Sequence, residues 1–183
     1  MSMTIRYYST NRNLNLGGGG KPFRETVSFR EALLMGQAPD EGLFMPERIP
    51  ELVPADVAAL KGMPYPEAAW LVARKFLAGE VELDRLRLVV EDAYNFSVPL
   101  ERVVGENYVL RLDQGPTASF KDFAARMMAR LMSMLRSPDK RLNVLVATSG
   151  DTGSAVGEAF KGVPGIDVTI LYPRDEVSSR QKK

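Results

Sequence analysis

The first part of the chain shows apolar residues at helical spacing, interrupted by proline and glycine. In SFREALLMG, residues 28–36, Ser28 and Glu31 have the spacing of a capping box, and two leucines supply an apolar face. Gly36 follows directly, as glycine often does at the end of a helix. The pattern therefore predicts a helix between Ser28 and Gly36.

Three more helices are predicted before residue 100. Segments 54–62 and 66–80 each open with proline and close at or beside glycine, which is the usual asymmetry of helix ends. A further helix is expected after Asp84. None of these segments carries obvious chemistry. We therefore predict a mainly helical, structural domain over residues 1–100 and a second domain over residues 101–183.

The second part of the chain reads as strands and helices in turn. Residues 106–117 alternate polar and apolar side chains and end in a Gly-Pro turn, as a strand does. The short β-branched runs 144–146 and 168–171 flank a glycine-rich turn and a helical segment. Such runs are typical of buried parallel strands. The segment is predicted to be a βαβ unit, and the chain to have an α/β fold.

Composition excludes several classes of function. The chain has 183 residues, a formal net charge of +1, no cysteine and no histidine. Thiol catalysis, a serine–histidine triad and histidine or cysteine zinc sites are impossible within it, and we expect no metal site. No charged block suggests nucleic acid or a membrane surface as a partner. The longest apolar stretch, residues 68–73, is too short to cross a bilayer, so a cytoplasmic protein is expected.

A run of four glycines occupies residues 17–20. A phosphate-binding loop would need a helix start directly after it, and the sequence has none. The run is therefore interpreted as a flexible turn.

The segment GPTASFKDFAARMM, residues 115–128, places a lysine at the start of a helix. Ser119 and Asp122 fit a capping pattern that puts Phe120 and Lys121 in the first helical turn. The positive end of the helix dipole disfavours an ammonium there by about 0.3–1 kcal/mol. The position is therefore an unusual one for a charged lysine.

Two interpretations of Lys121 are open from this stretch alone. Burial beside Phe120 and Phe123 would favour a neutral amine, the nucleophile that forms an imine with an aldehyde. Alternatively, Lys121 extends to solvent from the helix start, with Asp122 as a surface partner.

The segment ATSGDTGSAVGEAF, residues 147–160, leaves a predicted strand through a loop of small residues and enters a helix. Small residues let backbone amides approach a ligand, and a helix start binds anionic oxygens. The carboxyl end of a parallel strand is also where open α/β sheets bind ligands. Asp151 is unusual in an anion-binding loop, and it either contacts a hydroxyl or a cation or caps the helix.

Together these motifs resemble the threonine synthases, a family of pyridoxal-phosphate enzymes with the tryptophan-synthase-β fold (fold type II). GPTASFKDFAARMM is similar to the cofactor-lysine motif of that family, and TSGDTGSA is similar to its substrate loop. VSFREALLMG, DEGLFMPERIP and YNFSVPL resemble the small domain that precedes the catalytic core. The resemblance runs from about residue 4 to residue 183.

The resemblance implies roles for particular residues. Lys121 would bind pyridoxal 5'-phosphate through an imine and then move protons as a base, and Asp151 would lie near the cofactor. The family reaction converts O-phospho-L-homoserine and water to L-threonine and phosphate. Gln114 stands where the family commonly has histidine. The substrate-binding residues would be Ser149, Gly150, Asp151, Thr152, Gly153 and Ser154.

The resemblance also implies that residues 101–183 are the start of an incomplete catalytic domain. We therefore expect an N-terminal fragment of a threonine synthase that is inactive alone and forms homo-oligomers through an exposed sheet edge. Two alternatives remain: another fold-type-II lyase or dehydratase acting on a phosphorylated or hydroxy amino acid, and a non-catalytic small-molecule-binding remnant of the fold.

Overall fold

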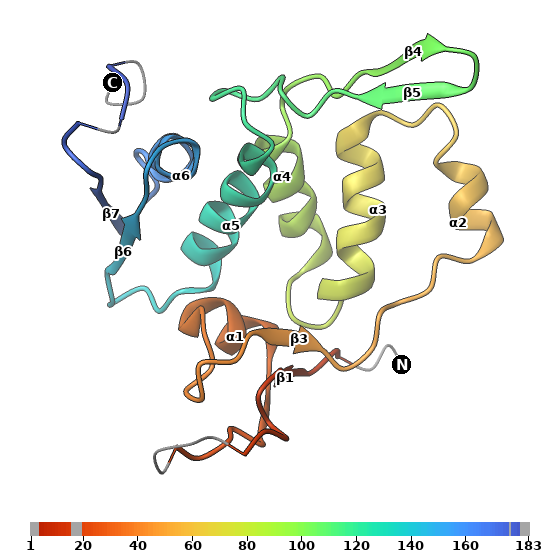
Figure 1. The fold of residues 1–183 in the computed structure, drawn as a ribbon. Helices are drawn as coiled ribbons and strands as arrows, with labels where there is room; N and C mark the ends of the chain where they lie inside the picture. Colours follow the sequence, from red (N-terminus) through yellow and green to blue (C-terminus); the bar gives the residue numbers. More distant parts are fainter. Residues whose placement is uncertain (1–3, 16–19, 176, 180–183) are drawn as a thin grey trace. The chain divides into compact units, whose positions relative to one another are not determined.

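The computed structural model of the chain describes residues 4–15, 20–175 and 177–179, so residues 17–19 of the glycine run lie outside the described part. The chain divides into two compact units, Met1–Leu88 and Val89–Lys183. Figure 1 traces their elements in chain order. The domain boundary expected after residue 100 stays a prediction.

The first unit opens with a small antiparallel sheet that the sequence pattern did not predict. Its strands are β1 (Tyr7–Ser9), β2 (Thr26–Val27) and β3 (Phe44–Pro46), in the order β2-β1-β3. Strands of two or three residues are too short to show a period in the sequence. Apolar side chains of β1 and β2 pack against the first helix in a core that includes Ile5 and Ala32.

The predicted capping box at Ser28 is confirmed. Helix α1 spans Phe29–Met35, and the Glu31 N–H donates to Ser28 Oγ at 3.1 Å. In return, the Ser28 N–H donates to Glu31 Oε2 at 2.7 Å. Gly36 follows with φ of 73°, a left-handed conformation that glycine adopts without strain.

The other three predicted helices are also present. They are α2 (Pro54–Ala59), α3 (Tyr65–Leu77) and α4 (Leu83–Ala93). Helix α4 begins slightly earlier than expected, because the Glu82 carboxylate accepts hydrogen bonds from the N–H groups of Asp84 and Arg85. No helix in the described ranges is long and apolar enough to cross a membrane.

Two strand pairs form the sheets of the second unit. Strands β4 (Leu100–Val104) and β5 (Asn107–Leu110) make an antiparallel hairpin that is exposed along its length. Strands β6 (Leu142–Ala147) and β7 (Ile166–Leu171) are parallel and joined by α6 (Asp151–Phe160), which confirms the βαβ unit.

These parallel strands are less buried than their short apolar runs indicated. Burial alternates along both strands, and Leu145 and Leu171 remain 65% and 54% exposed. One face packs against α6, and nothing in the described residues covers the other. An apolar run alone cannot distinguish a strand covered on both faces from one covered on a single face.

Helix α5 (Lys121–Leu135) packs closely against α6, because alanines such as Ala125, Ala129 and Ala155 lie in the shared core. Arg126 fixes the other side of α5. It is 8% exposed, and its guanidinium donates to the Ala93 carbonyl at 2.7 Å and to Asn95 Oδ1 at 2.9 Å. Burial lowers the pKa of Arg126. These bonds tie α5 to the end of α4.

Candidate functional site

The loop after β6 is shaped by a threonine hydroxyl. Thr148 Oγ1 accepts hydrogen bonds from the N–H groups of Gly150, at 3.1 Å, and Gly153, at 3.3 Å. Helix α6 begins at Asp151, and its N-cap residue is Gly150, which has no side chain that could cap the helix. Asp151 is therefore the first residue of α6 and not its N-cap residue, and the Thr148 hydroxyl binds the Gly153 amide that an N-cap side chain would bind.

Gly153 lets this loop pack tightly. A Cβ atom at that position would overlap Thr148 Cγ2 and press on Ile170 of β7. Thr148 therefore fixes the loop through its hydroxyl group and through its methyl group.

A buried carboxylate shapes the segment before α5. Asp122 is 1% exposed, and it accepts hydrogen bonds from the Thr117 N–H at 2.9 Å and the Thr117 hydroxyl at 2.7 Å. A Cβ at Gly115 would overlap the Asp122 side chain. The Gly115–Thr117 turn is thus folded back onto the first turn of α5.

The predicted Ser119–Asp122 capping box is not formed. The Asp122 side chain is engaged by Thr117, and Ser119 Oγ accepts a long hydrogen bond of 3.3 Å from the Lys121 N–H. Helix α5 begins at Lys121, as expected for that residue, and Phe120 lies just before it. The helix start expected here is present, but the Asp122 carboxylate bonds to Thr117 and not to Ser119.

The first of the two interpretations of Lys121, burial between Phe120 and Phe123, is not observed. Phe120 is 63% exposed, and Lys121 Nζ lies 4.7 Å from the centroid of its ring. Phe123 instead packs against Tyr94 and Phe96, at ring-centroid distances of 5.9 and 5.2 Å. Lys121 is therefore partly exposed at the helix start, in a cation–π contact with one phenylalanine.

A cavity of about 550 Å³ brings the two motifs together. The turn before α5 contributes Pro116 and Thr117 to its lining, and the loop after β6 contributes Thr148. Four of the predicted substrate-binding residues also line it: Gly150, Asp151, Gly153 and Ser154. Ser149, Thr152 and Lys121 are not part of the lining.

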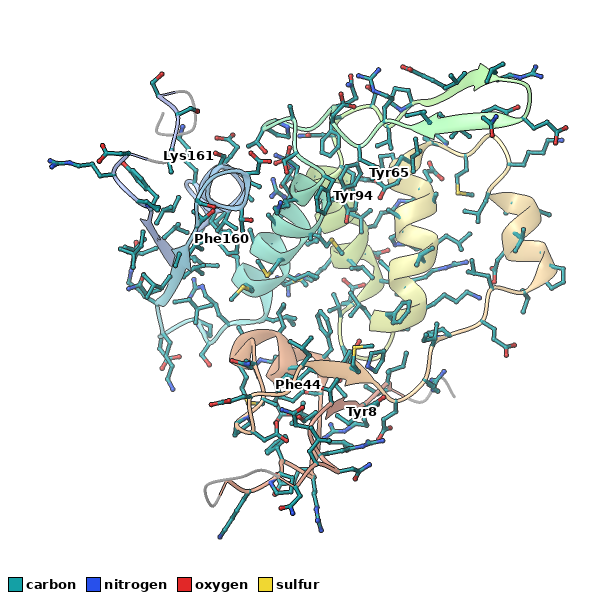
Figure 2. All side chains as sticks on the ribbon, viewed as in Figure 1. Tyr8, Phe44, Tyr65, Tyr94, Phe160 and Lys161 are labelled. Atoms are coloured by element: carbon teal, nitrogen blue, oxygen red, sulfur yellow. The ribbon has the colours of Figure 1, made fainter. Side chains whose placement is uncertain are left out.

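The cavity runs along one face of α6 and carries charges of both signs. Asp151 and Glu158 supply carboxylates, and Lys161, at the end of the helix, supplies an ammonium. Figure 2 labels Lys161 and its neighbour Phe160 on α6. Ser154 Oγ is buried and has no hydrogen-bond partner in the described part of the chain. A ligand with both a positive and a negative group would find partners here.

Sequence reasoning missed Thr117, Thr148 and Lys161. A detectable signal existed for Thr148, because a threonine two residues before a glycine amide often accepts a local hydrogen bond. No local signal places Lys161 in the cavity, since its position depends on the packing of α6. Across the described ranges, no group of three or more acidic residues could hold a metal ion.

The comparisons with known proteins agree on one family. The family model described as threonine synthase N terminus matches residues 6–94. Threonine synthase from Haemophilus influenzae is 40% identical over 159 residues, which are 87% of this chain and 37% of that protein. Threonine synthase from Escherichia coli is 36% identical over 163 residues, which are 89% of this chain and 38% of that protein.

Solved structures give the same result. The crystal structure of PLP-bound threonine synthase from Brucella melitensis superposes with a TM-score of 0.85 and 35% identity, covering 97% of this chain and 38% of that chain. Threonine synthase from yeast superposes with a TM-score of 0.82 and 30% identity, covering 96% of this chain and 37% of the yeast chain. The predicted α/β fold with a parallel strand pair is confirmed. The chain spans well under half the length of these relatives.

Proposed function

We propose that this chain forms part of a pyridoxal-phosphate-dependent lyase, because it belongs to the threonine synthase family and matches its N-terminal region. The proposed reaction converts O-phospho-L-homoserine and water to L-threonine and phosphate. Lys121 is assigned to the cofactor, and the loop from Ser149 to Ser154 is assigned to the substrate.

One observation supports this assignment above the others. The turn that leads into the Lys121 helix and the loop that opens α6 line the same cavity, although they are far apart in the sequence. A substrate carboxylate bound by the loop would therefore lie close to the start of α5. The amides at the start of α6 that Thr148 does not bind suit that carboxylate, and the Ser154 hydroxyl, which has no partner among the described residues, can donate to it.

The residues present fit the cofactor at two points. Lys121 supplies a primary amine on a partly exposed side chain, and the cavity next to its helix has room for a small organic molecule. When bound, pyridoxal phosphate supplies an electron sink. Lys121 would hold the cofactor through Nζ and then accept and return protons at that atom, and Asp151 would contact the cofactor. Before it could bind the cofactor, the Lys121 ammonium would have to move away from the Phe120 ring that it contacts.

The assignment is tested by incubating the chain with pyridoxal phosphate, reducing with borohydride and mapping the adduct by mass spectrometry. Lys161 is the natural competitor, because it lines the cavity and Lys121 does not. We expect one adduct on Lys121, absent in Lys121→Ala and retained in Lys161→Ala. Labelling of Lys161 in place of Lys121, or labelling spread over surface lysines, would contradict the assignment.

The same adduct separates the substrate classes. A substrate amine competes with Lys121 for the cofactor, so the proposed substrate should protect Lys121 from labelling. We expect O-phospho-L-homoserine to protect at lower concentration than O-phospho-L-threonine. The reverse order would favour a lyase for a different phosphorylated amino acid. The expected inactivity of this chain alone, its association through a sheet edge and its cytoplasmic location stay predictions.

A further inference from the structure

A second concave surface lies entirely in the first unit, between the segment after β3 and helix α3. It encloses about 410 Å³. Three basic residues line it against one carboxylate, with apolar contacts beside them: Arg48, Arg74, Lys75, Glu51, Pro50 and Leu83. None of these residues lines the cavity assigned to the proposed reaction.

Arg74 is held in a defined orientation in this pocket. Its guanidinium carbon lies 4.6 Å from the centroid of the Trp70 ring. Stacking on an aromatic face fixes the plane of a guanidinium and leaves its N–H edge available. No hydrogen bond joins the Arg74 guanidinium to another residue in the described ranges. The pocket thus contains an oriented, planar set of donors that no group in the described part of the chain accepts from.

Lys75 is held at the neighbouring position. Its ammonium forms an ion pair with Asp56 and donates to the Glu51 carbonyl at 3.4 Å. The Lys75 side chain is 25% exposed, so these bonds restrict it without burying it. An ammonium has three donors, and one of them is left for a ligand.

We propose that this pocket binds a small phosphate monoester. A planar guanidinium beside a compact ammonium suits the several oxygens of a phosphate group. The net charge of the pocket stays positive when the ion-paired Asp56 is counted, because three cations, Arg48, Arg74 and Lys75, stand against the two carboxylates of Glu51 and Asp56. Pro50 and Leu83 offer apolar surface to the carbon part of the ester. The site is independent of the proposed catalytic function and would act as an effector site.

Trp70 makes the proposal directly measurable, because it is the only tryptophan of the chain. Its fluorescence reports on the two guanidinium groups stacked on it, those of Arg74 and Arg87. We would titrate the chain with inorganic phosphate and with O-phospho-L-serine at constant ionic strength, and follow Trp70 emission and the binding heat. Saturable binding is expected for both, and it should be tighter for the monoester.

Arg87 provides the matched control. Its guanidinium carbon lies 4.8 Å from the same Trp70 centroid, but Arg87 does not line the pocket. Arg74→Gln should weaken phosphate binding about tenfold or more by calorimetry, as expected for the loss of a charge-assisted hydrogen bond. Arg87→Gln should leave it unchanged.

Three results would overturn the proposal. The first is equal weakening by Arg74→Gln and Arg87→Gln, and the second is a response that chloride reproduces at the same ionic strength. The third is monoester binding no tighter than that of inorganic phosphate, which would reject the ester as ligand.

Discussion

Asp40 in the first unit and Asp122 in the second have the same structural role in different surroundings. Both carboxylates are buried, with 5% and 1% of their surface exposed, and both hold a turn by accepting hydrogen bonds. Each is also approached by a glycine, Gly42 or Gly115, where a Cβ would overlap a neighbouring side chain. A buried carboxylate with a glycine against it is therefore a structural feature of this chain and does not by itself mark a site.

The difference lies in how far apart the partners are. Asp40 accepts from the Ser9 hydroxyl at 2.5 Å, the Phe23 N–H at 2.8 Å and the Gly42 N–H at 3.1 Å. It thus joins the end of β1 to two distant segments. Among the residues that the structure describes, Asp122 accepts hydrogen bonds from Thr117, which is close in sequence. Asp40 should therefore control the stability of its unit, and Asp122 should control the local shape of a cavity wall.

The largest expected effect is that of Asp40→Ala. It leaves a buried hydroxyl and two N–H groups without their acceptor, and it removes the side chain that bonds to both Ser9 and Phe23. We expect the first unit to lose cooperative unfolding, measured by circular dichroism during urea titration. Glu25→Ala, at an exposed carboxylate, is the control and should leave the transition unchanged. An unaltered midpoint for Asp40→Ala would contradict the comparison.

Asp122→Asn should have a smaller and more local effect. The amide keeps the shape of the carboxylate but loses the charge and one acceptor, so we expect a cost of about 1–3 kcal/mol in unfolding free energy. Because Thr117 lines the cavity, borohydride labelling of Lys121 should also fall. A loss of cooperative unfolding as large as that of Asp40→Ala would remove the distinction between the two carboxylates.

The same distinction separates what the sequence could predict from what it could not. The Ser28–Glu31 box was predictable, because a capping box is a local motif whose partners are three residues apart. The Asp40 contacts were not predictable, because they join residues up to 31 positions apart that only the folded chain brings together. Local patterns therefore predicted the helices but did not predict the small sheet that Asp40 supports.

The candidate site shows why even a local pattern can fail. Ser119 and Asp122 have the right spacing for a cap, but Thr117 offers the same carboxylate two donors and takes both of its oxygens. The pocket around Lys121 failed because Phe123 packs with Tyr94 and Phe96, away from the lysine. In both cases a competing partner, invisible to spacing, decided the outcome.

Substitution of Thr148 tests whether a neutral hydroxyl that accepts backbone hydrogen bonds stabilises the chain as the two buried carboxylates do. Thr148→Val removes the acceptor of the Gly150 N–H, whereas the Gly153 N–H keeps its bond of 3.0 Å to the Gly150 carbonyl. We expect a cost of about 1 kcal/mol, smaller than that of Asp122→Asn. Thr148→Ser keeps the hydroxyl and is the control. If Ser is as costly as Val, methyl packing beside Gly153 is the main contribution of Thr148.

The smallest effect is expected for a carboxylate that lacks burial. Asp167 pairs with Arg141 at 2.7 Å, but the two side chains are 60% and 69% exposed. The hydrogen bond from Arg141 lowers the pKa of Asp167 below its ordinary value of 3.8, so any stability from the pair is present above that pH and is lost as the pH falls through the lowered value. Water and salt screen such pairs strongly. We therefore expect Arg141→Gln to leave the unfolding midpoint unchanged at pH 7 in both low and high salt. A loss comparable to that of Asp122→Asn would mean that the ion pair, and not burial, is what makes a carboxylate stabilising in this chain.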